Sequence, residues 1–198
     1  VGAEDLLTRM RQIKTSEETE LLRRLSRISD KAINDALVGV SEGSSEMDIA
    51  TGLTQGVYSM GAHDFKLMIV ATGERSVFPN VGPSERLLKH QDVCRVEIFS
   101  VINGYQAGVC RTAVVNEPPR EAERIWQHLV ECKYLVMDMI RPGVSSRAVY
   151  EAFTEHMSQL DLAPIKFIGH GIGLHLHEEP YLGRYSDVPL EAGMVLGI

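Results

Sequence analysis

The chain has 198 residues, which is enough for one well-buried domain and barely enough for two. Its formal net charge of −7 excludes nucleic acid as a partner that binds through bulk electrostatics, because phosphate binding needs a basic face. No apolar run approaches the roughly 20 residues that span a bilayer, and the opening stretch lacks the apolar core of a signal peptide, so we expect no membrane partner.

The first elements are two helices and a strand. Thr15 can cap a helix, with Glu18 at the capping-box offset, and apolar residues follow at helical spacing to near Gly39. A second helix is predicted from Ser44 or Ser45 to about Met60. The stretch FKLMIVATG (65–73) is then typical of a buried strand, and a polar loop follows it.

A hairpin is the clearest short-range signal. In residues 92–115, apolar and β-branched residues alternate on either side of Asn103-Gly104. Pro118-Pro119 ends this pattern and opens a long helix over 120–140. Ser145 or Ser146 opens another helix to about Leu160, and 165–180 predicts strands punctuated by glycines. Helices therefore alternate with antiparallel hairpins, which defines an α+β class.

The three cysteines are Cys94, Cys110 and Cys132. Their odd number and the absence of a CxxC pair argue against a disulfide framework and against a structural zinc knuckle. We expect reduced cysteines in a cytoplasmic protein. The other histidines, His63, His90, His128 and His156, are expected at the surface.

Residues 169–180, GHGIGLHLHEEP, hold three histidines, three glycines and two glutamates. Such a run is typical of a metal site or an acid–base site. Glu97 stands in an otherwise apolar strand, where an unpaired charge is costly. That cost favours a functional carboxylate over a buried carboxylate that is merely satisfied by its neighbours.

Four segments carry a family resemblance: RQIKTSEETELLRR, RVEIFSVINGYQAGVCRT, GHGIGLHLHEEP and LEAGMVL, in that order. They resemble the pita-bread domain of the creatinase, prolidase and methionine aminopeptidase superfamily, peptidase family M24. The resemblance implies an antiparallel curved sheet covered by helices. It also implies that residues 1–198 form an incomplete catalytic-type domain, truncated at the C-terminal end, with a preceding domain and the final strands outside this chain. Val1, which is not an initiator Met, and the apolar ending GMVLGI agree with that expectation.

The resemblance also implies where a metal centre would lie. The peptidases of the family hold two divalent ions with two Asp, one His and two Glu. Glu97 stands at the first Asp position, Gly108 at the second and His170 at the histidine ligand, whereas the two Glu positions lie at or beyond Ile198. Because glycine has no side chain, we expect no catalytic metal. A single divalent ion bound by Glu97 and His170 is the alternative.

Creatinase and ectoine hydrolase are similar to this chain in having replaced metal ligands. We therefore expect a metal-independent hydrolase of a C–N bond in a small, polar, nitrogenous substrate. The resemblance gives Glu97 the role of nucleophile or base, His177 that of acid, and His170 that of holding the substrate or tuning Glu97. An Xaa-Pro dipeptidase or aminopeptidase with a degraded or single-metal site is the second hypothesis, and a non-catalytic binding protein is the third.

Three further residues are candidate substrate contacts. Asn80 stands where the family commonly has a histidine after a proline, which argues against creatine itself as the substrate. His175 is expected on the same side of a strand as His177, where it could contact the substrate; a surface position is the alternative. Tyr105 could also contact the substrate, and a packing role is the alternative. A homodimer is expected by resemblance alone, with a small-molecule or dipeptide substrate.

Overall fold

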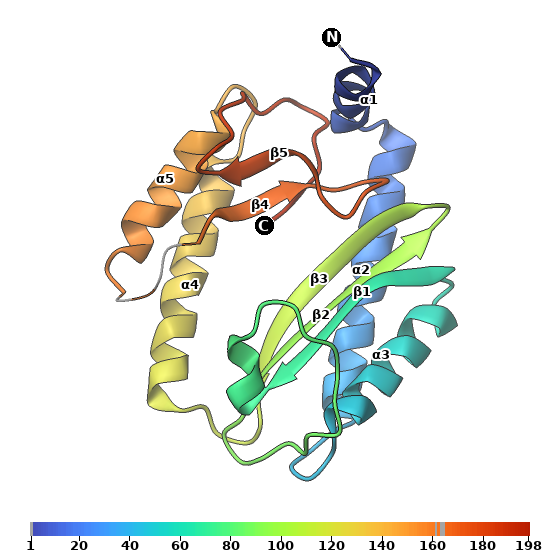
Figure 1. Ribbon diagram of the computed structural model, residues 1–198, viewed down its shortest axis with the longest axis vertical. Coiled ribbons are helices and arrows are strands. Elements are labelled where there is room, and N and C mark those ends of the chain that lie inside the picture. The colour runs from blue at the N-terminus through green and yellow to red at the C-terminus, as the bar shows by residue number, and fades with distance from the viewer. Residues whose placement is uncertain (1, 161, 163–164) are drawn as a thin grey trace. The chain divides into compact units, whose positions relative to one another are not determined.

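A computed structural model describes residues 2–160, 162 and 165–198. The chain divides into two compact units, one of residues 1–19 and 123–198 and one of residues 20–122. Each unit has its own three-stranded antiparallel sheet, in the order β1-β2-β3 in the unit of residues 20–122 and β5-β4-β6 in the other (Figure 1). Alternating helices and antiparallel strands confirm the predicted α+β class.

The unit of residues 20–122 contains two helices, a 3₁₀ turn and a meander: α2 (Ser16–Val38, which begins in the other unit), α3 (Glu46–Ser59), β1 (Asp64–Thr72), η1 (Gly73–Val77), β2 (Val93–Ile102) and β3 (Tyr105–Val114). The predicted capping box at Thr15 and Glu18 is confirmed, as is the Ser45 cap of α3. The hairpin is confirmed too, since Asn103 and Gly104 both have positive φ between β2 and β3.

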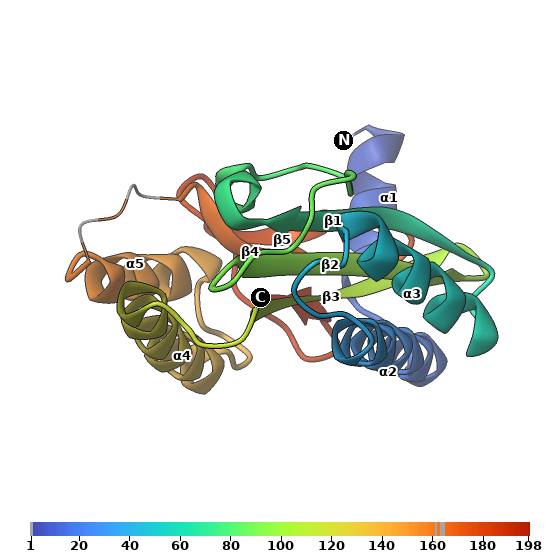
Figure 2. The same cartoon turned by 90° about the horizontal axis from the view of Figure 1, so that it is seen from below.

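Both helices cover one face of this sheet (Figure 2). The Ser29 hydroxyl of α2 lies 2.8 Å from the Ser100 hydroxyl of β2, and both residues are fully buried. Residues of the same parity as Ser100, including Val96 and Ile98, are therefore turned toward the helices. Glu97 has the opposite parity, so its side chain lies on the face that α2 and α3 leave uncovered.

The two helices approach each other through glycines. A Cβ at Gly52 would lie 3.0 Å from the Cβ of Ala36, and one at Gly56 would lie 3.0 Å from the Cβ of Ala32. Small residues on both helices thus let the backbones approach closely. This close packing holds α3 against α2 beneath the sheet.

The buried carboxylate of Glu46 anchors the loop between β1 and β2. It accepts hydrogen bonds from the backbone and hydroxyl of Thr72, and from the backbone and hydroxyl of Ser84, and it forms an ion pair with Arg75 at 3.1 Å. Asn80 lies in this loop and is exposed. The loop is therefore held at both ends, with Asn80 facing solvent.

The other unit contains α1 (Ala3–Gln12), most of α4 (Arg120–Met139), α5 (Ser146–Met157), β4 (Phe167–Gly171), β5 (Glu178–Gly183) and β6 (Leu196–Gly197). Its core is formed by Val136, Val149, Leu182 and Leu190. Ser145 caps α5 as predicted, whereas helix α1 was not predicted. Among the described helices of both units, none has the length and apolar character needed to cross a membrane.

A buried ion pair joins the start of this unit to its end. Lys14 Nζ lies 2.8 Å from Glu178 Oε2, with the two side chains 2% and 5% exposed. The backbone N–H of Lys14 also donates to the carbonyl of Gly193 at 2.9 Å. Lys14 comes from the RQIKT segment and Glu178 from the HEEP segment, so two of the segments that carry the family resemblance meet here.

We expect Lys14→Ala to lower the free energy of unfolding by about 3–5 kcal/mol, because it leaves Glu178 charged and buried without its partner. Lys31→Ala is the matched control: Lys31 pairs with Asp35 on the exposed side of α2, and its loss should cost under about 0.5 kcal/mol. The double variant Lys14→Met with Glu178→Leu should recover much of the loss. Urea unfolding of the full chain measures all three, and equal stability of the two Lys→Ala variants would contradict the prediction.

Candidate functional site

Glu97 lies at the centre of β2, half-buried, with Ile69 of β1 and Cys110 of β3 as its cross-strand neighbours. Within its own unit, the carboxylate makes no hydrogen bond or ion pair with any described residue. Burial raises the pKa of Glu97 above its ordinary value, and the charge of nearby Arg95 opposes that rise only in part. A carboxylate with a raised pKa and no competing partner is a stronger base than an exposed glutamate.

The ring of Phe99 covers Gly108. The two residues are paired across β2 and β3, and Phe99 is 7% exposed. A Cβ placed on Gly108 would lie 2.5 Å from two ring carbons of Phe99 and 2.7 Å from the carbonyl oxygen of Ile98. The strand pair therefore has no room for a side chain at position 108, and no sequence signal pointed to Phe99 as the cause.

His170 is buried at the end of β4. Its Nδ1 lies 2.8 Å from the carbonyl oxygen of Gly171, which can only accept, so Nδ1 carries the hydrogen and Nε2 carries the lone pair. Burial lowers the pKa of His170, and the neighbouring His177 lowers it further against the opposing effect of that hydrogen bond. His170 is thus held neutral, with Nε2 as an acceptor.

Three aromatic rings gather around His170. The ring of His177 lies 4.0 Å from it between centroids, and Phe167 stands edge-on to both histidines. The Tyr181 hydroxyl lies 3.4 Å from His177 Nδ1, and burial together with the charge of Glu179 raises the pKa of Tyr181. Sequence analysis predicted the two histidines but missed Phe167 and Tyr181, whose rings lie 5.4 Å apart between centroids and pack against both imidazoles.

The prediction that His175 and His177 share a strand is wrong. Residues 173–177 form an irregular loop between β4 and β5, and both histidines are exposed there. The His175 backbone N–H donates to Glu178 Oε1 at 3.1 Å, which turns the chain before β5 begins. His175 is accordingly outside the ring cluster. Tyr105 lies at the start of β3 and is half-buried; its role, like that of Asn80, stays a prediction.

A groove of about 290 Å³ borders the ring cluster. Phe167 and Tyr181 line it together with Lys166, Arg184 and Glu179. The groove combines an apolar wall with two cations and one carboxylate. Such a lining suits a small substrate that carries both an acid and an amine.

The fold is the pita-bread fold of α+β hydrolases, as predicted. The prolidase from Pyrococcus furiosus superposes with a TM-score of 0.93 at 27% identity, over 97% of this chain and 58% of that one. The chain belongs to metallopeptidase family M24, whose model matches residues 20–198.

Two curated relatives are similar to this chain over nearly all of its length. The Xaa-Pro dipeptidase of Pyrococcus furiosus is 27% identical, over 98% of this chain and 57% of that protein. The probable dipeptidase PepE of Mycobacterium tuberculosis is 29% identical, over 100% of this chain and 54% of that protein. The chain thus spans a little over half the length of these relatives. Their names are those of dipeptidases, rather than of creatinase or ectoine hydrolase, which sequence analysis had favoured.

The family's name raises the question of whether these residues fit a pair of divalent ions. A two-metal centre needs a bridging carboxylate, and position 108 has neither a side chain nor space for one. Glu97 and His170 could each donate one ligand, but neither replaces a bridging carboxylate at position 108. The described residues therefore do not fit the two-metal centre of the family.

We expect Gly108→Ala to lower the free energy of unfolding by about 1–3 kcal/mol, because the new methyl overlaps the Phe99 ring. Gly82→Ala is the control, since a Cβ there would meet no atom within 4 Å. Adding Phe99→Ala to Gly108→Ala should relieve the overlap with the ring. Chemical unfolding measures the four proteins, and a Gly108→Ala variant as stable as the control would show that the pair is not tightly packed.

Proposed function

We propose that this chain is the catalytic-type domain of a C–N hydrolase that acts on small substrates of the Xaa-Pro dipeptide class, with a site that departs from the two-metal centre of its family. The observation that carries the proposal is the family match over residues 20–198, together with relatives named as Xaa-Pro dipeptidases. The groove beside the ring cluster supports it, because Lys166 and Arg184 can pair with a carboxylate while Glu179 can pair with an ammonium group.

Glu97 and the histidines have complementary abilities. As a base, Glu97 takes a proton from water, and the resulting hydroxide attacks the carbonyl carbon of the scissile amide. His177 then donates a proton to the leaving nitrogen as the C–N bond breaks. His170 is neutral, and its Nε2 can accept a hydrogen bond from an N–H group of the substrate. That bond orients the substrate.

We expect Glu97→Gln to reduce kcat/KM by about 100-fold or more, because the amide cannot accept the proton. It should also stabilise the fold at neutral pH. The raised pKa means that ionised Glu97 costs folding free energy, a cost present above its folded pKa and absent at acidic pH. Glu20→Gln, an exposed glutamate of α2, is the control. Activity assays and unfolding curves check both effects, and full activity of Glu97→Gln rules out the role.

A double-variant comparison tests whether Glu97 and His177 serve one reaction. If both act in the same step, Glu97→Gln combined with His177→Gln should lose little more activity than the worse single variant. Losses that multiply would mean that the two residues act independently. Circular dichroism of each variant checks that the fold is intact.

A second candidate is metal-independent hydrolysis of an amidine or guanidino group. Phe99 over Gly108 favours it, since without a bridging carboxylate at position 108 Glu97 can act as a direct nucleophile. In that reaction the Glu97 carboxylate would bond to the amidine carbon, and the C–N bond would break as the leaving nitrogen takes a proton from His177. Water would then displace Glu97 from that carbon and release the product.

Substrate and metal assays of the full-length protein separate these candidates. We expect turnover of Xaa-Pro dipeptides in preference to cyclic amidines and guanidino compounds, and we expect added Mn²⁺ to give no spin-coupled electron paramagnetic resonance signal, because no carboxylate can bridge two ions at position 108. A coupled signal would show that two ions are bridged, which would contradict the argument that these residues do not fit a two-metal centre. Turnover of amidines alone would support the second candidate in place of the first. Dipeptide binding without turnover would indicate a binding protein.

A further inference from the structure

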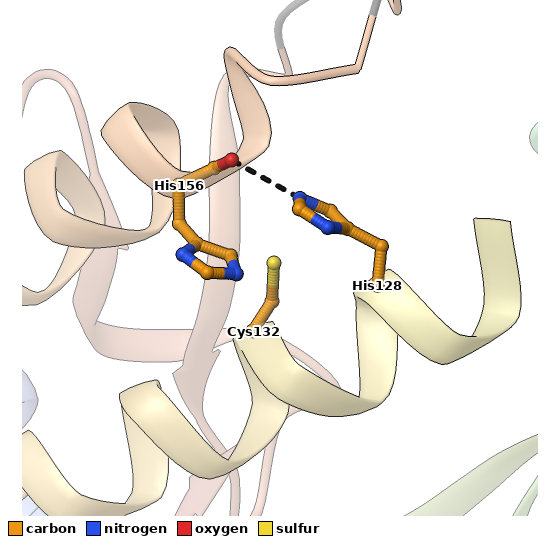
Figure 3. Close-up of side chains that lie close together, drawn as sticks. All are labelled: His128, Cys132 and His156. Carbon is orange, nitrogen blue, oxygen red and sulfur yellow. Dashed lines mark hydrogen bonds between the residues drawn. The ribbon is translucent and has the colours of Figure 1, made fainter. Parts of the chain in front are cut away.

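A second histidine cluster lies away from the GHGIG segment, between α4 and α5. His128 and Cys132 stand one turn apart on α4, and His156 lies in the last turn of α5 (Figure 3). One ligand atom from each residue lies within 4.8 Å of the other two. His63 and His90 are exposed as expected, but that expectation is wrong for His128 and His156, which are half-buried because the two helices pack here.

A hydrogen bond fixes the tautomer of His128. Its Nε2 lies 3.1 Å from the backbone carbonyl oxygen of His156, drawn as the dashed line in Figure 3. A carbonyl only accepts, so Nε2 carries the hydrogen and Nδ1 presents the lone pair. Histidines that bind metals are commonly oriented in this way, by donating their other N–H to a carbonyl or carboxylate.

His156 also directs a nitrogen into the cluster. Its Nε2 is buried and has no hydrogen-bond partner among the described residues. The two imidazoles stack with centroids 4.6 Å apart and planes 13° apart. The unpartnered nitrogen of His156 and the lone pair of His128 Nδ1 therefore belong to two rings in direct contact.

Glu131 lies where both nitrogens point. Its Oε2 is 3.7 Å from His128 Nδ1 and 3.6 Å from His156 Nε2. Its side chain is 66% exposed, which leaves one side of the cluster open to an entering ion. Cys132 supplies the inner side. It is 1% exposed and is a free thiol, and Figure 3 draws it close to the two rings.

We propose that His128, Cys132 and His156, with Glu131 as the fourth donor, bind a divalent transition ion of the zinc class. Two imidazoles, a thiolate and a carboxylate complete a four-coordinate shell, and the sulfur selects zinc or cobalt over magnesium or calcium. Neighbouring donor atoms around tetrahedral zinc lie about 3.3–3.7 Å apart. Binding therefore draws the ligand atoms together and turns the stacked rings until both lone pairs meet at the ion. The thiol proton and any imidazole proton leave as the ion binds. The site is independent of the proposed hydrolysis, and its ion fastens α4 to α5.

Cobalt substitution tests the proposal, because a cobalt–thiolate bond gives a near-ultraviolet charge-transfer band that nitrogen and oxygen ligands do not. Full-length protein stripped of metal by a chelator is titrated with Co²⁺. We expect one equivalent to produce this band together with the intense visible bands of a tetrahedral ion, and Zn²⁺ to displace it. The thermal midpoint of unfolding should rise when zinc is added.

Matched variants locate the ion. Cys132→Ser should abolish the charge-transfer band, whereas Cys110→Ser, which removes an exposed cysteine outside the cluster, should keep it. His128→Gln retains the thiol and should weaken cobalt binding at least 10-fold, which covers the case in which Cys132→Ser fails to fold. Cobalt that binds without the charge-transfer band, or a band lost in Cys110→Ser and kept in Cys132→Ser, overturns the proposal.

Discussion

The ion pair between Lys14 and Glu178 is the constraint on which the histidine segment depends. Glu178 accepts from Lys14 through one oxygen and from the His175 backbone through the other, and it crowds Gly173, where a Cβ would lie 2.9 Å away. The loop that follows β4 is therefore closed around one carboxylate. An apolar pair of similar size could match its contribution to stability. What the charges add is direction, because the carboxylate that Lys14 holds also accepts the His175 backbone N–H, two residues before the His177 ring that lies beside His170.

The contact between Phe99 and Gly108 is the second constraint. It affects the carboxylate side of the family motif and leaves the imidazole pair unchanged. The GHGIG segment keeps its imidazole pair through local features: the hydrogen bond to Gly171, the edge-on Phe167 and the Tyr181 hydroxyl. None of these depends on an ion. The carboxylate side of the family centre depends on β2 and β3 instead, and there an aromatic ring occupies the space above a glycine. The two halves of the motif therefore depend on separate local contacts.

Much of the fold was predictable because its signals are local. The caps at Thr15, Ser45 and Ser145 and the Asn103-Gly104 turn each depend on a few neighbouring residues, and all four are confirmed. The ion pair of Lys14 with Glu178 joins residues 164 positions apart, so no window of sequence could reveal it. The assignment of His175 and His177 to a strand failed because alternation was read through glycines, where the chain instead follows Glu178. Phe99 escaped notice because its effect appears only across the hairpin.

The two histidine clusters show how the same side chain takes different chemistry from its surroundings. In the GHGIG cluster, apolar and aromatic neighbours remove water from His170, and the carboxylate of Glu179 lies near Tyr181. That environment favours a neutral imidazole that accepts a hydrogen bond from a substrate. Between α4 and α5, a buried thiol and a solvent-facing carboxylate stand around the two rings, so the surroundings supply negative charge once the thiol is deprotonated. A cation neutralises that charge, whereas a proton can occupy only one donor at a time. The residues flanking each imidazole pair, rather than the histidines, therefore decide that one cluster suits a substrate and the other an ion.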